Sequence, residues 1–147
     1  MKKFNILFSI VIFTSLFLVS CGDKNEPLNF EAFSMEVFAY DLGDGYEINA
    51  SVRVKGFVQT EESGNHSTKV SFVVDLVKPD GTKISNIANG IQEKNQTEKF
   101  IDIPVEAQFE LDTTYAAGNY KLILNLKDEV GKQTVVIEKD FSIDGED

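Results

Sequence analysis

From about residue 30 onward, apolar and polar side chains alternate with a period of two residues. The alternation is clearest over residues 46–55, where apolar side chains occupy every second position. Successive side chains of a β-strand point to opposite faces of a sheet, so this segment predicts a strand with one buried and one solvated face. No later segment shows the helical period of about 3.6 residues. The chain is therefore predicted to be all-β.

The same alternation predicts further strands along the chain. A short strand is also expected near residues 82–87. Residues 85–99 are polar enough to predict a long loop, in which Ile87, Ala88 and Ile91 would make at most one helical turn. The predicted inward-facing sets are Phe33, Met35, Val37 and Ala39; Val70, Phe72, Val74 and Leu76; Ile101, Ile103, Val105, Ala107, Phe109 and Leu111; Tyr120, Leu122, Leu124 and Leu126; and Val135, Ile137, Phe141 and Ile143.

Turn residues separate these strands. The segment Asp41-Leu42-Gly43-Asp44-Gly45 predicts a hairpin, because Asp-Gly pairs supply the positive φ angles of tight turns. Turns are also expected at residues 78–81 and 128–131. Pro104 cannot donate a hydrogen bond to a neighbouring strand, so its strand should lie at a sheet edge or switch sheets near it.

About seven short antiparallel strands with these connections favour an immunoglobulin-like antiparallel β-sandwich over residues 30–147. The C-terminal stretch, Gly118 to Asp128, then Gly131, then Phe141-Ser142-Ile143, resembles the last hairpin of many bacterial immunoglobulin-like domains. The chain has no Trp and one Cys, so it lacks the buried Trp and disulfide of antibody-type members. The resemblance implies the fold and assigns no functional residues.

The first residues have a different character. Lys2 and Lys3 precede an apolar run from Ile6 to Leu18, which is too short for a membrane-spanning helix and is typical of a secretion signal. The sequence Leu18-Val19-Ser20-Cys21 resembles the lipobox of bacterial lipoproteins. That resemblance implies cleavage of residues 1–20 and a diacylglycerol, usually with a further acyl chain, on Cys21. Several acyl chains anchor a protein firmly.

Residues 21–29 comprise the lipidated Cys21 and a polar tether that contains Pro27. Gly22 stands where an Asp favours inner-membrane retention in well-studied bacteria, so the outer membrane is the expected location. Asp23 and Glu26 loosely resemble the acidic export signal of Bacteroidetes lipoproteins. The periplasmic side and the cell surface are both open alternatives.

Charge limits the partners. The chain has 14 basic and 24 acidic residues, a formal net charge of −10, and loss of Lys2 and Lys3 would make it more acidic. Such a surface repels phosphates and anionic headgroups. We therefore expect no nucleic-acid binding, and the lipid on Cys21 alone should hold the protein to its membrane.

The inventory of catalytic residues argues against an enzyme. The only histidine, His66, lies in a polar segment that predicts a solvated loop, and an acylated Cys21 leaves no cysteine nucleophile. Calcium is the alternative considered for small ligands, because carboxylates fall at predicted strand ends. Turn formation explains the same residues, so neither a metal nor another cofactor is predicted. These carboxylates belong to Asp41, Asp44, Asp80, Asp112 and Asp128.

Two further features belong to the predicted surface. Phe38, Phe57 and Tyr115 are predicted to point outward, as the stacking platform of a carbohydrate-binding sandwich would, although packing explains them too. Asp112-Thr113-Thr114 resembles the acceptor of O-glycosylation in exported Bacteroidetes proteins, with Thr113 as the modified residue.

Two functions follow as hypotheses. The first is a structural or protein-interaction module of the cell envelope that binds another envelope protein. The alternative is a surface accessory that captures glycans or peptides, and it requires that Phe57 and Tyr115 not both pack inward.

Overall fold

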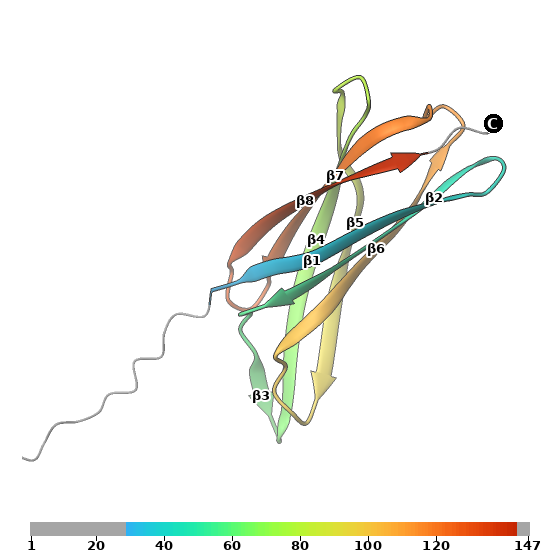
Figure 1. Cartoon of the computed structure of the whole chain (residues 1–147). Helices are drawn as coiled ribbons and strands as arrows, with labels where there is room; N and C mark the ends of the chain where they lie inside the picture. Colours follow the sequence, from blue (N-terminus) through green and yellow to red (C-terminus); the bar gives the residue numbers. More distant parts are fainter. Residues whose placement is uncertain (1–28, 144–147) are drawn as a thin grey trace, which may run out of the picture.

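The computed structural model describes residues 29–143, which form eight strands in two antiparallel sheets (Figure 1). The signal sequence, Cys21 and most of the tether lie outside the described residues. Within residues 29–143 there is no helix, and so none that is long and apolar enough to cross a membrane. The strands are β1 (Glu31–Asp41), β2 (Gly45–Lys55), β3 (Thr60–Glu62), β4 (Asn65–Val77), β5 (Lys83–Gln96), β6 (Asp102–Asp112), β7 (Gly118–Asp128) and β8 (Thr134–Ile143).

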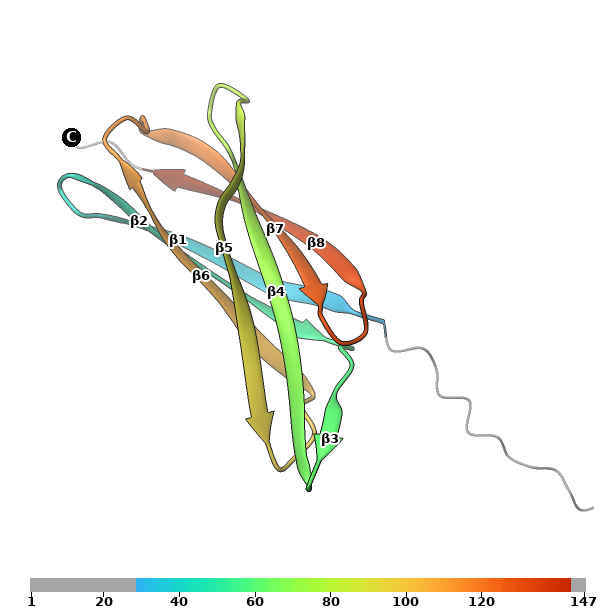
Figure 2. The same cartoon turned by 180° about the vertical axis from the view of Figure 1, so that it is seen from behind.

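The sheets face each other as a sandwich, which confirms the predicted all-β class (Figures 1 and 2). The first sheet has the order β1-β2-β6. In the second, β4 pairs with β5 along one edge, while β7, followed outward by β8, and the short β3 share its other edge. If the short β3 is not counted, β5 is the fourth strand of the sandwich. In the constant-type immunoglobulin sandwich the fourth strand belongs to the sheet of the first, second and fifth strands. Here β5 pairs with β4 in the second sheet.

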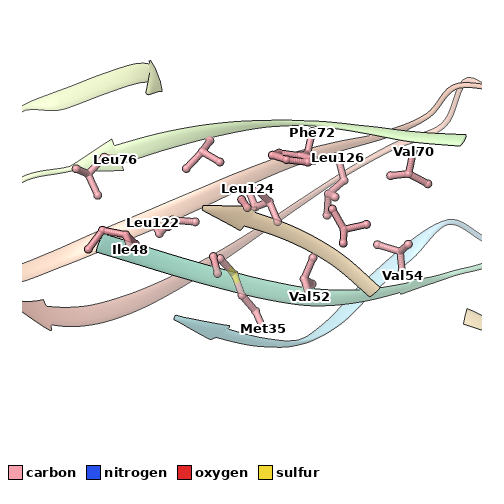
Figure 3. Packing of buried hydrophobic residues seen from close by; sticks show 14 of the residues in the cluster. Met35, Ile48, Val52, Val54, Val70, Phe72, Leu76, Leu122, Leu124 and Leu126 are labelled. Atoms are coloured by element: carbon pink, nitrogen blue, oxygen red, sulfur yellow. The ribbon is translucent and has the colours of Figure 1, made fainter. Parts of the chain in front are cut away.

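The core lies between the sheets and consists of the alternating apolar side chains (Figure 3). The predicted inward sets of β4 and β7 are all buried, as are the apolar positions of β2 from Ile48 to Val54. The face assignments of these strands are therefore confirmed. The most deeply buried side chains include Phe57, Ile48, Leu76, Ile103, Leu111, Leu122, Leu124 and Leu126.

Strand β5 corrects the loop predicted over residues 85–99. It is a 14-residue strand paired with β4 from His66 to Val77, and the short strand expected near residues 82–87 is only its first part. Because β5 is an edge strand with little of either face buried, its sequence lacks the alternation of a half-buried strand. Gly90 lies opposite Phe72, and a Cβ atom there would be 2.7 Å from the Phe72 ring.

A bulge in β1 corrects one face assignment. Ser34 has φ +53°, and the register with β2 shifts between Phe33 and Glu36. As a result Phe33 lies opposite Arg53 on the outer face, while Met35, Val37 and Ala39 contact the core as predicted. The sequence pattern alone does not reveal the extra residue of a bulge.

The prediction for Pro104 is confirmed, because β6 pairs with β2 alone and is an edge strand. Ile101 was assigned to the inward set of this strand but precedes it and is 86% exposed. The inward set therefore begins at Ile103.

The expected turns are present. In the β1–β2 hairpin, Gly43 and Gly45 carry the positive φ angles, and the Gly43 amide donates to the Asp41 carboxylate. Where β7 begins, the Tyr120 hydroxyl donates to the Ala116 carbonyl at 2.6 Å. In immunoglobulin-like sandwiches, a Tyr near the start of the sixth strand, which is β7 here if the short β3 is not counted, makes such a bond to the backbone of the preceding connection.

Candidate functional site

The predicted modification site lies on an exposed turn. Thr113 follows β6 directly, and its neighbour Thr114 donates its amide to the Asp112 carboxylate at 2.8 Å. The pKa of Asp112 is lowered, chiefly by a hydrogen bond from the Thr114 hydroxyl and then by this bond from the Thr114 amide. The Thr113 side chain is exposed. The lipidation residue Cys21 lies outside the described residues.

The expectation that His66 is a solvated loop residue is wrong. His66 belongs to β4, where β3 and β5 flank it, and its side chain is 12% exposed. Its Nε2 atom lies 4.0 Å from a carboxylate oxygen of Glu61. The polar residues 61–67, predicted as a loop, form a hairpin with its turn at Ser63 and Gly64, and strand pairing covers the imidazole.

The carboxylates considered for calcium mostly cap their own turns. Asp41, Asp80 and Asp112 each accept the backbone N–H two residues further on. Asp128 is fully buried and accepts the amides of Val58 and Val130, so it links the β2–β3 connection to the β7–β8 turn. Within residues 29–143, no three acidic or histidine side chains gather closely enough to hold a metal ion.

The proposed aromatic platform is not formed. Phe57 is only 2% exposed and belongs to the core, and Tyr115 packs against the core, partly buried. Gly56, with φ +72°, explains the error for Phe57 because it breaks the alternation at the end of β2. A Cβ atom at Gly56 would collide with the carbonyl of Asn29. Of the three aromatics, Phe38 points outward as predicted and is 52% exposed.

A different feature emerges on the outer face of the first sheet. Pairing in register arranges its outward side chains in rows that cross β1, β2 and β6. Two rows at the end where β1 begins, the paired rows, are Glu31–Lys55–Asp102 and Phe33–Arg53–Pro104. The next rows, toward the β1–β2 hairpin, are called the acidic rows: Glu36–Ser51–Glu106, Phe38–Asn49–Gln108 and Tyr40–Glu47–Glu110.

Every charge in the paired rows is balanced. Lys55 Nζ lies 3.0 Å from Glu31 Oε2, and Arg53 forms an ion pair with Asp102. Lys55 Nζ also lies 5.7 Å from the centre of the Phe33 ring, within cation–π range. The pKa of Glu31 is lowered, chiefly by its bond with Lys55. Each charged side chain of the paired rows therefore has a partner of opposite charge within the same rows.

The acidic rows contain no cation. Their carboxylates, Glu36, Glu47, Glu106 and Glu110, form no ion pair with any described residue, and only Glu47 has a side-chain donor, the Asn49 amide at 2.6 Å. Two aromatic side chains stand beside them, Phe38 and Tyr40, each about half exposed at 52% and 53%. The face combines exposed rings with uncompensated negative charge.

Glu47 and Glu110 lie directly opposite each other in the pairing of β2 with β6. Like charges at directly opposite positions destabilise a sheet. A hollow of 460 Å³ crosses the neighbouring rows, lined by Phe38 of β1, Asn49 and Ser51 of β2, and Glu106 and Gln108 of β6, among others. Among the carboxylates of the acidic rows, Glu106 lines this hollow, and no described cation pairs with any of the four.

The outer face of the second sheet differs in charge. Lys83 pairs with Asp75 at 2.8 Å and Lys121 with Glu138 at 2.9 Å. At the β7–β8 turn, Ser71, Lys127 and Lys132 all donate to Glu129. The Ser71 bond, then the two lysines, lower the pKa of Glu129 to about 2. Lysines thus pair with Asp75, Glu129 and Glu138 of the second sheet, whereas no described cation pairs with the four carboxylates of the acidic rows.

Comparisons with known proteins show no family and no function. No family model and no curated protein matches the chain. The similar solved structures include a protein of Bordetella pertussis designated ApaA, with 12% identity over 80% of this chain and 94% of that one, at a TM-score of 0.42. A protein from Archaeoglobus fulgidus has 14% identity over 78% and 98%, at 0.35. A Northeast Structural Genomics Consortium target has 13% identity over 80% and 85%, at 0.41.

Proposed function

We propose that this protein is a lipid-anchored module of the bacterial cell envelope whose β-sandwich binds another envelope protein and catalyses no reaction. The anchor rests on the lipobox-like sequence ending at Cys21. The immunoglobulin-like type of the sandwich rests on the Tyr120–Ala116 bond and on the resemblance of the last hairpin. Domains of this kind serve widely as binding modules on cell surfaces.

The acidic rows are the observation that carries the binding role. Aromatic side chains are enriched in protein interfaces relative to the rest of the surface. Phe38 and Tyr40 are each about half exposed, and the outward positions of β2 and β6 in the same three rows are all polar or charged. A partner that covers the directly opposed carboxylates of this sheet with positive charge should stabilise the sheet, because it removes their repulsion.

Site-specific photo-cross-linking in living cells tests the binding role. A photoreactive residue replaces Tyr40 in one variant and Val136 in a matched control, since Val136 is 61% exposed on the outer face of the other sheet. We expect a discrete cross-linked protein from position 40 and none from position 136. No adduct at position 40, or the same adducts from both positions, would contradict the proposal.

The outer membrane is the proposed location, with the periplasmic side and the cell surface as alternatives. Protease treatment of intact cells separates them, with a periplasmic protein as the lysis control. Loss of the domain places it outside. Protection places it in the periplasm, provided that the same protease cleaves the purified domain.

We further propose Thr113 as an O-glycosylation acceptor. The support is its exposed turn and the Asp112-Thr113-Thr114 sequence. Intact-mass measurement of the native protein and of Thr113→Val tests this, because only the native protein should carry the extra mass. Equal mass increments on both proteins would exclude Thr113.

The glycan-capture alternative loses its support. It required that Phe57 and Tyr115 not both pack inward, and both contact the core. Phe38 alone of that set remains exposed, and it belongs to the acidic rows.

A further inference from the structure

We infer that the partner presents arginine or lysine side chains to the acidic rows, an inference that rests on the proposed binding function. The acidic rows carry negative charge that no described cation balances. Glu36, Glu47, Glu106 and Glu110 share this surface, and no described cation pairs with any of them. A positively charged partner surface removes the repulsion within the rows and is attracted to them at long range.

The paired rows show how a cation binds on this face. In the paired rows, Lys55 lies over the ring of Phe33 from β1 and contacts the carboxylate of Glu31. The acidic rows contain the ring and the carboxylate of this arrangement. Phe38 and Tyr40 supply rings on the same outer side of β1, and carboxylates lie in the row of Tyr40 and in the rows beside that of Phe38. The missing part is the cation.

The exposed rings and carboxylates of the acidic rows together favour a protein partner. A protein segment with basic side chains fits, because a guanidinium stacks on an aromatic face while its N–H groups bond carboxylates. Nucleic acids and anionic headgroups carry the same sign of charge as this surface and do not fit. Arginine should bind more tightly than lysine, since its planar group engages ring and carboxylate together.

The test uses the full-length protein, purified from membranes in a nonionic detergent, and a synthetic peptide of six arginines. The double variant Glu47→Gln with Glu110→Gln removes the opposed charges and keeps the side-chain shapes. The matched control is Glu62→Gln with Glu98→Gln, which makes the same change in net charge at exposed residues away from the rows. Affinity is measured at physiological salt, and a thermal unfolding midpoint verifies that each variant is folded.

We expect the first double variant to bind the peptide about tenfold more weakly, and the control to change by less than about twofold. Tyr40→Leu, which keeps apolar area but removes the ring, should weaken binding by about threefold. Equal losses in both double variants, or tighter binding of spermine than of the peptide, would overturn the inference. A cross-linked partner at position 40 would in that case still uphold the proposed function.

Discussion

At the scale of single residues, the protein holds most of its carboxylates in defined bonds and leaves a few unbalanced. Asp128 accepts two backbone amides in the interior, and Asp75 is held by Lys83, Asn86 and Asn125. Lys83 is the main reason that the pKa of Asp75 is lowered. Glu47 and Glu110, in contrast, face each other in register. Unfolding measurements on variants at these carboxylates can therefore distinguish side chains that stabilise the fold from those of the candidate site.

Neutralising Glu110 should stabilise the domain. Glu110→Gln removes the like charge opposite Glu47 and leaves the Asn49–Glu47 bond in place. The expected gain in the free energy of unfolding is about 0.2–1 kcal/mol, from urea denaturation at neutral pH. Glu98→Gln is the control and should change little. A loss of stability in Glu110→Gln would mean that this carboxylate has a stabilising role in the free protein.

Glu129 should make stability depend on pH in the acidic range. Its folded-state pKa of about 2 lies below the ordinary value of 4.5, so the folded state holds this proton less tightly than the unfolded state. The contribution of Glu129 is therefore present above pH 4.5 and is lost as the pH falls toward 2. Glu129→Gln should unfold more easily than the native protein at pH 7, and the difference should close by about pH 2. A difference independent of pH would contradict this assignment.

At the scale of elements, the strands with one buried face were predictable and the irregular ones were not. The inward sets of β2, β4 and β7 follow from alternation alone. The pattern fails where backbone geometry overrides it: the bulge at Ser34 turns Phe33 outward, and Gly56 turns Phe57 inward. Strand β5 was missed because an edge strand is held mainly by backbone pairing.

Most of the candidate site could not be predicted from the sequence, because it depends on the register of the paired strands. Alternation places Glu47 and Asn49 on a solvated face, but it does not show which residues of β6 lie opposite them. Glu47 and Glu110 are 63 positions apart in the chain and meet only through strand register. Register depends on turns and core packing together, which a single sequence does not specify.

Gly90 is the clearest test of the β4–β5 pairing. Gly90→Ala places a Cβ atom against the ring of Phe72, so the ring must move within the packed core. We expect a loss of about 1–3 kcal/mol in the free energy of unfolding. Asn89→Ala, an exposed position in the same strand, is the control. An unchanged stability in Gly90→Ala would contradict the register of β5.

The facing of β7 is tested by a charge in the core. Leu124 is buried between the sheets, and Leu124→Asp should cost several kcal/mol unless the carboxyl is protonated or paired. Val136→Asp, on the exposed face of β8, should cost far less. Thermal unfolding compares the two variants, and similar midpoints for them would show that the assigned faces are wrong.

At the scale of the whole molecule, the acidic rows lie toward the end of the sandwich opposite the start of β1. Figure 1 shows β1 running from its start to the β1–β2 hairpin at the other end of the sandwich. With a rise of about 3.3 Å per strand residue, Tyr40 lies about 30 Å along β1 from Glu31. An anchored protein would thus hold the candidate surface away from its membrane.

Anchoring should depend on Cys21. The net charge of −10 opposes adsorption to anionic membranes, so the lipid supplies the attachment in this account. Because cleavage before residue 21 is expected to depend on this cysteine, Cys21→Ser is combined with a cleavable secretion signal without a lipobox in place of residues 1–20. This variant should move from the membrane fraction to the soluble fraction without a change in its unfolding midpoint. Its retention on membranes after a high-salt wash would contradict the lipid anchor.

The proposed role of the acidic rows is to bind a partner through their negative charge. The test is the yield of cross-linked protein from a photoreactive residue at position 40, in cells with the native rows and in cells with Glu47→Gln and Glu110→Gln. We expect a discrete adduct with the native rows and, in the double variant, a fall of the yield to the level of the position-136 control. An adduct that persists at full yield without these two charges would contradict it.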